Sequence, residues 1–167
     1  MPRSFDFLVE SSVSVEQIHS AFSEEDYWLA RLAAFGGIGK LDSFNIGTDG
    51  SVHLVITQGL RHDWVPMPFA KLYPRDLDVV QSETWSLIGA DLIRGEVITS
   101  ALGARGSGLG TVVMAPVQNG SRLKCTATVK FNVPLVGGAI ESYFGRQTVE
   151  QTPEMLRFTA KWITEHA

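Results

Sequence analysis

The sequence predicts a single α+β domain over residues 1–167, in which a curved antiparallel sheet of about seven strands surrounds a long C-terminal helix. Two observations predict it. Apolar and polar residues alternate in successive segments joined by short turns, and the absence of crossover helices between these segments favours antiparallel pairing. Residues 140–167 instead repeat apolar positions at helical spacing. A wide antiparallel sheet curls, so the helix is expected to cover its concave face.

The N-terminal part predicts one strand followed by two short helices. Residues 3–12 alternate in the manner of a half-buried strand. Ser14, followed three residues later by Gln17, forms a capping-box pattern that begins the first helix. The acidic residues in 23–26 suit the first turn of a second helix, which the glycines at 36–37 are expected to end.

From residue 40 the pattern changes to strands. Asp49-Gly50 lies between two alternating segments and predicts a hairpin. Four more segments follow, separated by Gly89-Ala90, the glycine-rich stretch 103–110 and Asn119-Gly120. We interpret 103–110 as a hairpin loop and 36–40 as a turn, because neither has the spacing of a phosphate-binding loop.

The C-terminal helix carries an unusual polar interruption. Its expected inward stripe consists of Ile140, Phe144, Gln147, Gln151, Met155, Phe158 and Trp162. A buried amide without partners costs about 1–3 kcal/mol, so a hollow beneath the helix would explain the two glutamines. Pro153 removes a helical N–H and predicts a bend near 149–153. The alternative is that the helix bulges into solvent at this point.

Composition excludes several classes of function. The formal net charge of -4 and the scattered basic residues argue against a nucleic-acid partner. The one cysteine, Cys125, allows no internal disulfide, and no stretch has the length of a signal peptide or membrane span. The four histidines lack metal-ligand spacing, so we expect no metal and no cofactor. Together these features favour a cytoplasmic protein without an integral membrane span.

Six motifs carry a family resemblance: DYWLARLAAFGG (26–37), AKLYP (70–74), ETW (83–85), SRLKCTATV (121–129), PLVGGAIES (134–142) and RFTAKWITEH (157–166). With them the whole chain resembles the START-like (SRPBCC, helix-grip) superfamily, and most closely an uncharacterised bacterial START-like group. The superfamily includes lipid-transfer domains, plant pathogenesis-related proteins and polyketide cyclases. The resemblance implies a cavity between the sheet and the last helix that accepts an apolar ligand.

Candidate ligand-binding residues follow from this cavity: Trp64, Phe69, Tyr73, Glu83, Trp85, Val97, Phe131, Phe144, Gln147, Gln151 and Met155. The first three belong to the proline-containing segment 61–76, which forms either the mouth of the cavity or a satellite core under a long loop. Glu83 would contact the polar end of a ligand, together with the two glutamines. Alternatively, Glu83 lies on the outer face of the sheet or pairs with Arg94 on the next strand.

The function favoured by the sequence is non-catalytic binding or carriage of a small hydrophobic or amphipathic ligand, such as a lipid, a fatty acid or a polyketide. Two alternatives remain open. One is an enzyme of the polyketide cyclase or aromatase type, in which Glu83 acts as acid or base. The other is a protein-interaction module that uses the aromatic segment 61–76.

Overall fold

The computed structural model describes residues 2–35, 39–60, 71, 77–102 and 106–167. The elements follow one another as β1 (Arg3–Ser11), α1 (Val15–Phe22), α2 (Glu25–Phe35), β2 (Gly39–Ile46), β3 (Val52–Leu60), β4 (Leu77–Ile88), β5 (Leu92–Leu102), β6 (Gly106–Val117), β7 (Gly120–Phe131) and α3 (Gly137–Glu165). The predicted α+β fold and the order of its elements are confirmed.

Seven strands form one antiparallel sheet in the order β1-β7-β6-β5-β4-β3-β2. Neighbouring strands from β2 to β7 are consecutive in the chain, and β1 completes the sheet beside β7. At the predicted hairpin, Gly50 adopts a φ of 82°, and the carboxylate of Asp49 accepts a hydrogen bond from the Ser51 N–H at 3.0 Å. Short local turns therefore account for most of the topology.

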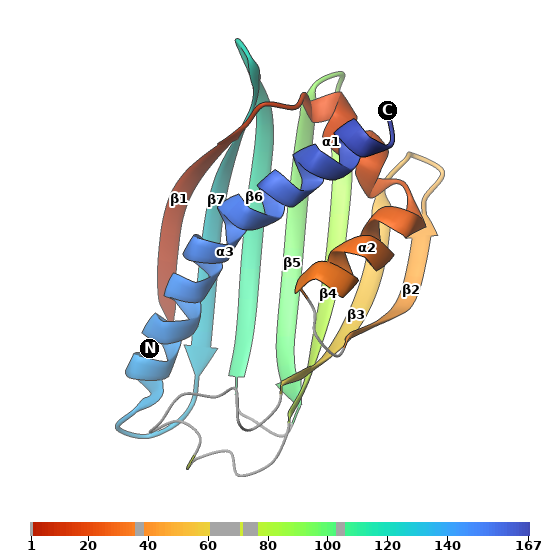
Figure 1. The fold of residues 1–167 in the computed structure, drawn as a ribbon. Helices are drawn as coiled ribbons and strands as arrows, with labels where there is room; N and C mark the ends of the chain where they lie inside the picture. The colour runs from red at the N-terminus through yellow and green to blue at the C-terminus, as the bar shows by residue number, and fades with distance from the viewer. Residues whose placement is uncertain (1, 36–38, 61–70, 72–76, 103–105) are drawn as a thin grey trace.

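The helices all lie against one face of the curled sheet (Figure 1). The capping box at the start of α1 is present, because the Ser14 hydroxyl accepts from the Gln17 N–H and the Gln17 side chain accepts from the Ser14 N–H. Helix α3 crosses the concave face diagonally and packs on β1 and β7, whereas α2 packs on β2. The two helices thus cover opposite edges of the same face of the sheet.

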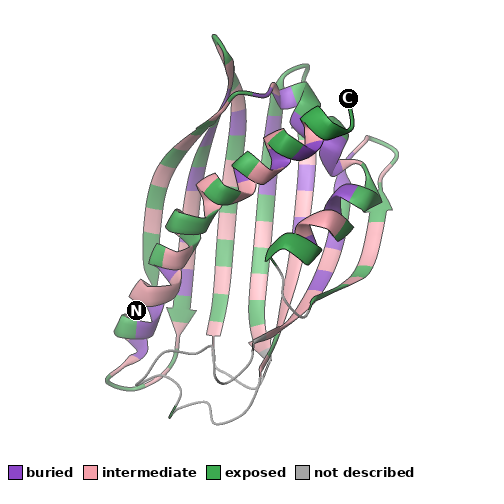
Figure 2. Ribbon diagram, viewed as in Figure 1, coloured by how far each residue is buried: buried purple, intermediate pink, exposed green. Residues whose placement is uncertain are grey.

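A cluster of aromatic rings fills the end of the molecule where α1, α2 and the C-terminal half of α3 meet. The ring centroids of Phe22 and Trp85 lie 4.8 Å apart, and those of Tyr27 and Trp162 lie 5.4 Å apart. Trp28 is fully buried beside them. Figure 2 shows the buried positions gathered toward this end, while the opposite ends of the central strands are half-buried or exposed. The solid core therefore occupies only part of the concave face.

The interpretation of 103–110 as a loop is wrong for its second half. Gly106 begins β6, and residues 106–110 pair with both β5 and β7. Glycine fits the strand at position 106 because a Cβ there would overlap the ring of Phe131. Residues 103–105 lie outside the described part of the chain, as do the glycines at 36–37 that were expected to end the second helix.

The buried face of α3 differs from the expected stripe in the middle of the helix. Its buried residues are Gly137, Ile140, Glu141, Gly145, Leu156, Thr159 and Trp162. Gln147 is half-buried and Gln151 is exposed. The reason is Gly145, against which the ring of Phe5 packs so closely that a Cβ would overlap it. The helix thus turns its smallest residue toward β1, and this rotation carries Gln147 away from the sheet.

Pro153 lies within α3, which continues through it without interruption. The hydroxyl of Thr152 donates to the carbonyl of Thr148 at 2.7 Å, and the hydroxyl of Thr148 donates to that of Phe144 at 3.0 Å. These bonds back onto the helix are typical of threonine in helices and accompany bending. The bend near 149–153 stays a prediction. None of the described helices combines the length and apolarity needed to cross a bilayer.

Candidate functional site

A cavity of about 240 Å³ lies between the concave face of the sheet and the helices. Strands β4 to β7 form its floor, Phe7 and Phe22 contribute from β1 and α1, and the segment of α3 from Thr148 to Thr159 forms its roof. Arg31 reaches it from α2. Its lining is predominantly apolar with a few polar groups, as in small-molecule sites, and its volume is slightly below the roughly 300–1,000 Å³ typical of those sites.

The floor is hollow because small residues occupy inward positions of the central strands. Gly110 lies opposite Val97 on β5 and Ala127 on β7, and Gly108 precedes it by two residues on β6. A Cβ on Gly110 would lie 3.6 Å from the Val97 Cβ, which is an ordinary contact, so nothing in the packing demands glycine here. The sequence signal was present: glycines at 106, 108 and 110 repeat with the period of a strand.

Glu83 lies on the inward face of β4 and is 2 % exposed. Its Oε1 accepts a hydrogen bond from Trp85 Nε1 at 3.0 Å, and its Oε2 accepts one from Gln81 Nε2 at 2.7 Å. The alternative pairing with Arg94 is wrong, because Arg94 lies opposite Ser86 and is exposed on the other face of the sheet. Two neutral donors on the same strand therefore hold this carboxylate in the cavity wall.

Arg31 is a charged lining residue that sequence reasoning missed. Its guanidinium lies 5.0 Å from the ring centroid of Trp28, and its Nη2 donates to the Met155 sulfur at 3.0 Å. Burial favours the neutral form, but nearby Tyr27 and Glu83 outweigh this effect and raise the pKa of Arg31 above its ordinary value. A signal existed, because Arg31 stands one helical turn after Tyr27 and Trp28, on the buried side of α2.

A buried hydrogen bond links α2 to α3 beside the cavity. The Thr159 hydroxyl donates to the Met155 carbonyl at 2.8 Å and accepts from the Tyr27 hydroxyl at 2.7 Å. Burial raises the pKa of Tyr27, and the positive charge of Arg31 opposes part of that effect. The bond fixes the separation of the two helices at one edge of the cavity.

The structure brings five of the predicted ligand-binding residues to the cavity: Glu83, Trp85, Val97, Gln151 and Met155. Phe131 and Phe144 stack on each other at 5.4 Å and are not among the described lining residues. Gln147 is not among them either, since it lies on the outer side of α3 and donates to the Tyr143 hydroxyl at 3.3 Å. The prediction that both glutamines hang into one hollow is therefore corrected.

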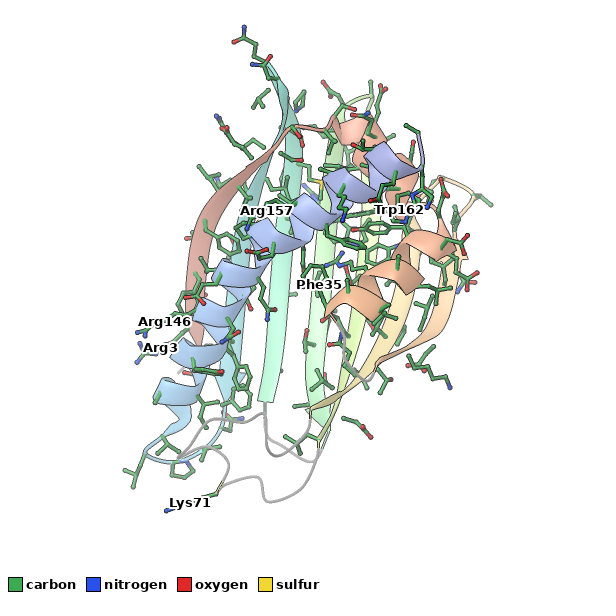
Figure 3. The ribbon with its side chains drawn as sticks, in the orientation of Figure 1. Arg3, Phe35, Lys71, Arg146, Arg157 and Trp162 are labelled. Atoms are coloured by element: carbon green, nitrogen blue, oxygen red, sulfur yellow. The ribbon has the colours of Figure 1, made fainter. Side chains whose placement is uncertain are left out.

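The remaining predicted residues, Trp64, Phe69 and Tyr73, lie outside the described part of the chain, so the proposed cavity mouth at 61–76 stays a prediction. Figure 3 shows Trp162 at the C-terminal end of α3, toward α2, and Arg3 and Arg146 near its N-terminal half. The aromatic core thus lies at the C-terminal end of α3, and the two arginines lie near its N-terminal half.

Cys125 faces the cavity from β7, as its place in the alternating pattern predicts. Burial raises the pKa of its thiol to about 11. At neutral pH the side chain is therefore a small apolar wall residue and a weak nucleophile. Within the described ranges, no three His, Cys, Asp or Glu side chains come together in a way that could hold a metal ion.

Comparison with known proteins identifies relatives along the whole chain. The family described as "Protein of unknown function (DUF2505)" matches residues 6–163. Uncharacterized proteins of Mycobacterium tuberculosis and Mycobacterium bovis are each 34% identical over 173 residues, which cover 99% of both chains. Both relatives are thus similar to this chain from end to end.

Solved structures share the fold at low sequence identity. Ara h 8.0201 has a TM-score of 0.57 and 12% identity, with 99% of each chain covered. Norcoclaurine synthase from Thalictrum flavum has a TM-score of 0.53 and 16% identity, covering 100% of this chain and 89% of its own. The di-domain ARO/CYC protein StfQ has a TM-score of 0.61 and 13% identity, and the match covers 99% of this chain and 52% of StfQ. The START-like, helix-grip resemblance is thereby confirmed at the level of fold.

Proposed function

The chain belongs to the family described as protein of unknown function (DUF2505), and we propose that its cavity binds and carries a small hydrophobic or amphipathic molecule without catalysing a reaction. Molecules of the lipid, fatty-acid or polyketide class suit a lining of this chemistry. The cavity between the sheet and α3 is the observation that carries the proposal.

The glycines of β6 make the cavity difficult to explain by stability alone. Glycine in a strand interior costs roughly 0.5–1 kcal/mol relative to alanine, and unfilled apolar space loses packing energy as well. Gly108 and Gly110 have room for a side chain, yet none is present. A requirement for internal space explains both positions.

The solved structures with this fold support a role in binding organic molecules. The norcoclaurine synthase structure contains dopamine and hydroxybenzaldehyde, and StfQ belongs to the steffimycin biosynthetic pathway. A small aromatic or chain-like compound is therefore a reasonable occupant for the cavity of this chain.

A cyclase-type enzyme is the second candidate, favoured by the carboxylate of Glu83 in the cavity wall. Non-catalytic binding is preferred because both oxygens of Glu83 already accept hydrogen bonds from Gln81 and Trp85. A carboxylate that removes a substrate proton needs an oxygen within hydrogen-bond reach of that proton.

A plugged variant tests the proposed binding. The neutral apolar fluorophore N-phenyl-1-naphthylamine should bind the native protein with enhanced, saturable fluorescence. Gly110→Val places two methyl groups in the cavity and should weaken this binding at least about tenfold, while the better strand-forming residue preserves stability. Ser107→Val adds the same side chain on the exposed face of β6 and should leave binding unchanged.

Native mass spectrometry of freshly purified protein supplies an independent readout, in which a bound small molecule should appear as an added mass. Absence of saturable probe binding by the native protein would contradict the proposal. Equal probe affinity in Gly110→Val and the unmodified protein would place the probe outside the cavity and contradict it as well.

A further inference from the structure

Few charged side chains line the cavity, and they differ in how far their hydrogen-bonding groups are already satisfied. Among the described lining residues, Arg31 is the one permanently cationic side chain and Glu83 is the one carboxylate. Within the described part of the chain, no ion pair joins either of them to a side chain of opposite charge. The two groups lie close enough for Glu83 to influence Arg31 electrostatically.

Arg31 has hydrogen-bonding capacity to spare. A guanidinium carries five N–H donors. Arg31 bonds to the hydroxyl of Tyr27 and to the Met155 sulfur, a weak acceptor, at 3.0 Å, so donors remain for a further acceptor. The ring of Trp28 supports the guanidinium at 5.0 Å and limits its movement. A cation fixed in position at a cavity wall, with donors left open, is prepared to receive an acceptor from a bound molecule.

Glu83, in contrast, already has a hydrogen-bond donor at each carboxylate oxygen. Its two oxygens accept from Trp85 and Gln81, and the side chain is 2 % exposed. The group therefore needs no ligand to satisfy it. Its negative charge still acts on the cavity, where it disfavours a ligand that carries several negative charges.

We propose that the molecule carried in the cavity is an amphipathic monocarboxylic acid, whose carboxylate binds the guanidinium of Arg31 and whose apolar part lies over Gly108 and Gly110. This inference rests on the proposed function and names its ligand class. Arginine and carboxylate match each other in a two-point geometry, and charge-assisted hydrogen bonds of this kind are roughly twice as strong as neutral ones.

Matched ligands that differ only in their head group test the inference. Decanoic acid, decan-1-ol and decylamine would compete with N-phenyl-1-naphthylamine at pH 7.5, where the acid is ionised and the amine is protonated. The native protein should bind decanoate at least about tenfold more tightly than decan-1-ol, as expected for a hydrogen bond to a charged group. Decylamine should bind no better than the alcohol.

Three variants locate the effect. Arg31→Gln should abolish the preference for decanoate and leave the affinity for decan-1-ol within about twofold. Glu83→Gln should strengthen decanoate binding several-fold, because it removes the neighbouring negative charge while its amide can still accept from Trp85. Arg94→Gln removes the same charge from the opposite, exposed face and should change nothing.

The outcomes separate the two proposals. Equal displacement by decanoate and decan-1-ol from the native protein overturns the inference and leaves cavity binding intact. If Arg31→Gln still prefers decanoate to decan-1-ol, the inference is overturned too. Weaker decanoate binding by Glu83→Gln than by the native protein also overturns it, and this second test remains available if Arg31→Gln fails to fold. Failure of the native protein to bind the fluorophore or any of the three ligands overturns both proposals.

Discussion

The indole N–H of Trp85 donates a hydrogen bond at 3.0 Å to the carboxylate of Glu83, two residues earlier on β4. Residues two apart on a strand share a face, so the ring and the carboxylate both lie toward the cavity. Both are almost fully buried. The bond thus orients a wall residue of the cavity and satisfies a polar group that has little access to water.

Replacing Glu83 separates its hydrogen-bonding role from its charge. Glu83→Leu leaves the buried indole N–H of Trp85 without its acceptor and should lower the free energy of unfolding by about 1–3 kcal/mol. Glu83→Gln keeps an acceptor oxygen and should change it by less than about 1 kcal/mol. Urea denaturation followed by circular dichroism measures both values. A leucine variant as stable as the native protein would show that the bond contributes nothing.

A second relationship involves Trp85 and the strand beside it. A Cβ on Gly95 would overlap the six-membered ring of Trp85, which packs directly on this backbone. Alanine normally stabilises a strand relative to glycine, but Gly95→Ala should destabilise the protein by about 1–3 kcal/mol, because the ring must move within a packed core.

Gly110→Ala is the matched control for this change. It also faces inward, yet its Cβ would make only an ordinary contact of 3.6 Å with Val97. It should therefore be neutral or stabilising by up to about 1 kcal/mol. If both alanine variants shifted the urea midpoint equally and in the same direction, the close packing of Trp85 on Gly95 would be refuted.

Tyr27 should make the stability of the protein fall at high pH. Burial raises its pKa in the folded state above the ordinary value of 10.0, whereas the unfolded chain releases this proton near that value. Between the two values the unfolded state binds fewer protons, so the free energy of unfolding decreases as the pH rises. The contribution is fully present below about pH 9.

Tyr27→Phe tests this linkage. At neutral pH it removes the bond to Thr159 and should cost about 0.5–1.5 kcal/mol. Above about pH 10 the difference from the native protein should shrink, because the variant has no proton to release at this position. Urea denaturation at several pH values from 7 to 11 gives the comparison. Parallel stability curves for the two proteins would contradict it.

Signals that act between neighbouring residues predicted the fold well. The alternation of Phe5, Phe7 and Val9, the capping box at Ser14 and the Asp49-Gly50 turn all act within a few residues, and each is present in the structure. Sequential hairpins then leave few possible arrangements for β2 to β7. The fold was therefore accessible from local physical chemistry.

The cavity was less accessible because it depends on small residues and on elements distant in the chain. Apolar periodicity gives no weight to Gly145, yet the close approach of Phe5 at this glycine sets the rotation of α3 and moves Gln147 outward. Arg31 lies on α2 and Glu83 on β4, with β2 and β3 between these elements in the chain, so only the folded sheet brings the two residues together. Their proximity is a tertiary property that no local pattern contains.

The reactivity of Cys125 measures how accessible the cavity wall is to solvent, because Cys125 is the one cysteine of the chain and one of the lining residues. Burial raises its pKa from 9.0 to about 11, so at pH 8 the folded protein should hold roughly 100-fold less thiolate than the unfolded chain. Since the thiolate is the reactive form, alkylation by iodoacetamide should be slower by a similar factor in the native protein than in urea. Gly110→Val, which fills neighbouring space, should slow it further, whereas Ser107→Val should not. A native rate within about threefold of the rate in urea would mean that Cys125 is open to bulk water, which would contradict its burial in the cavity wall.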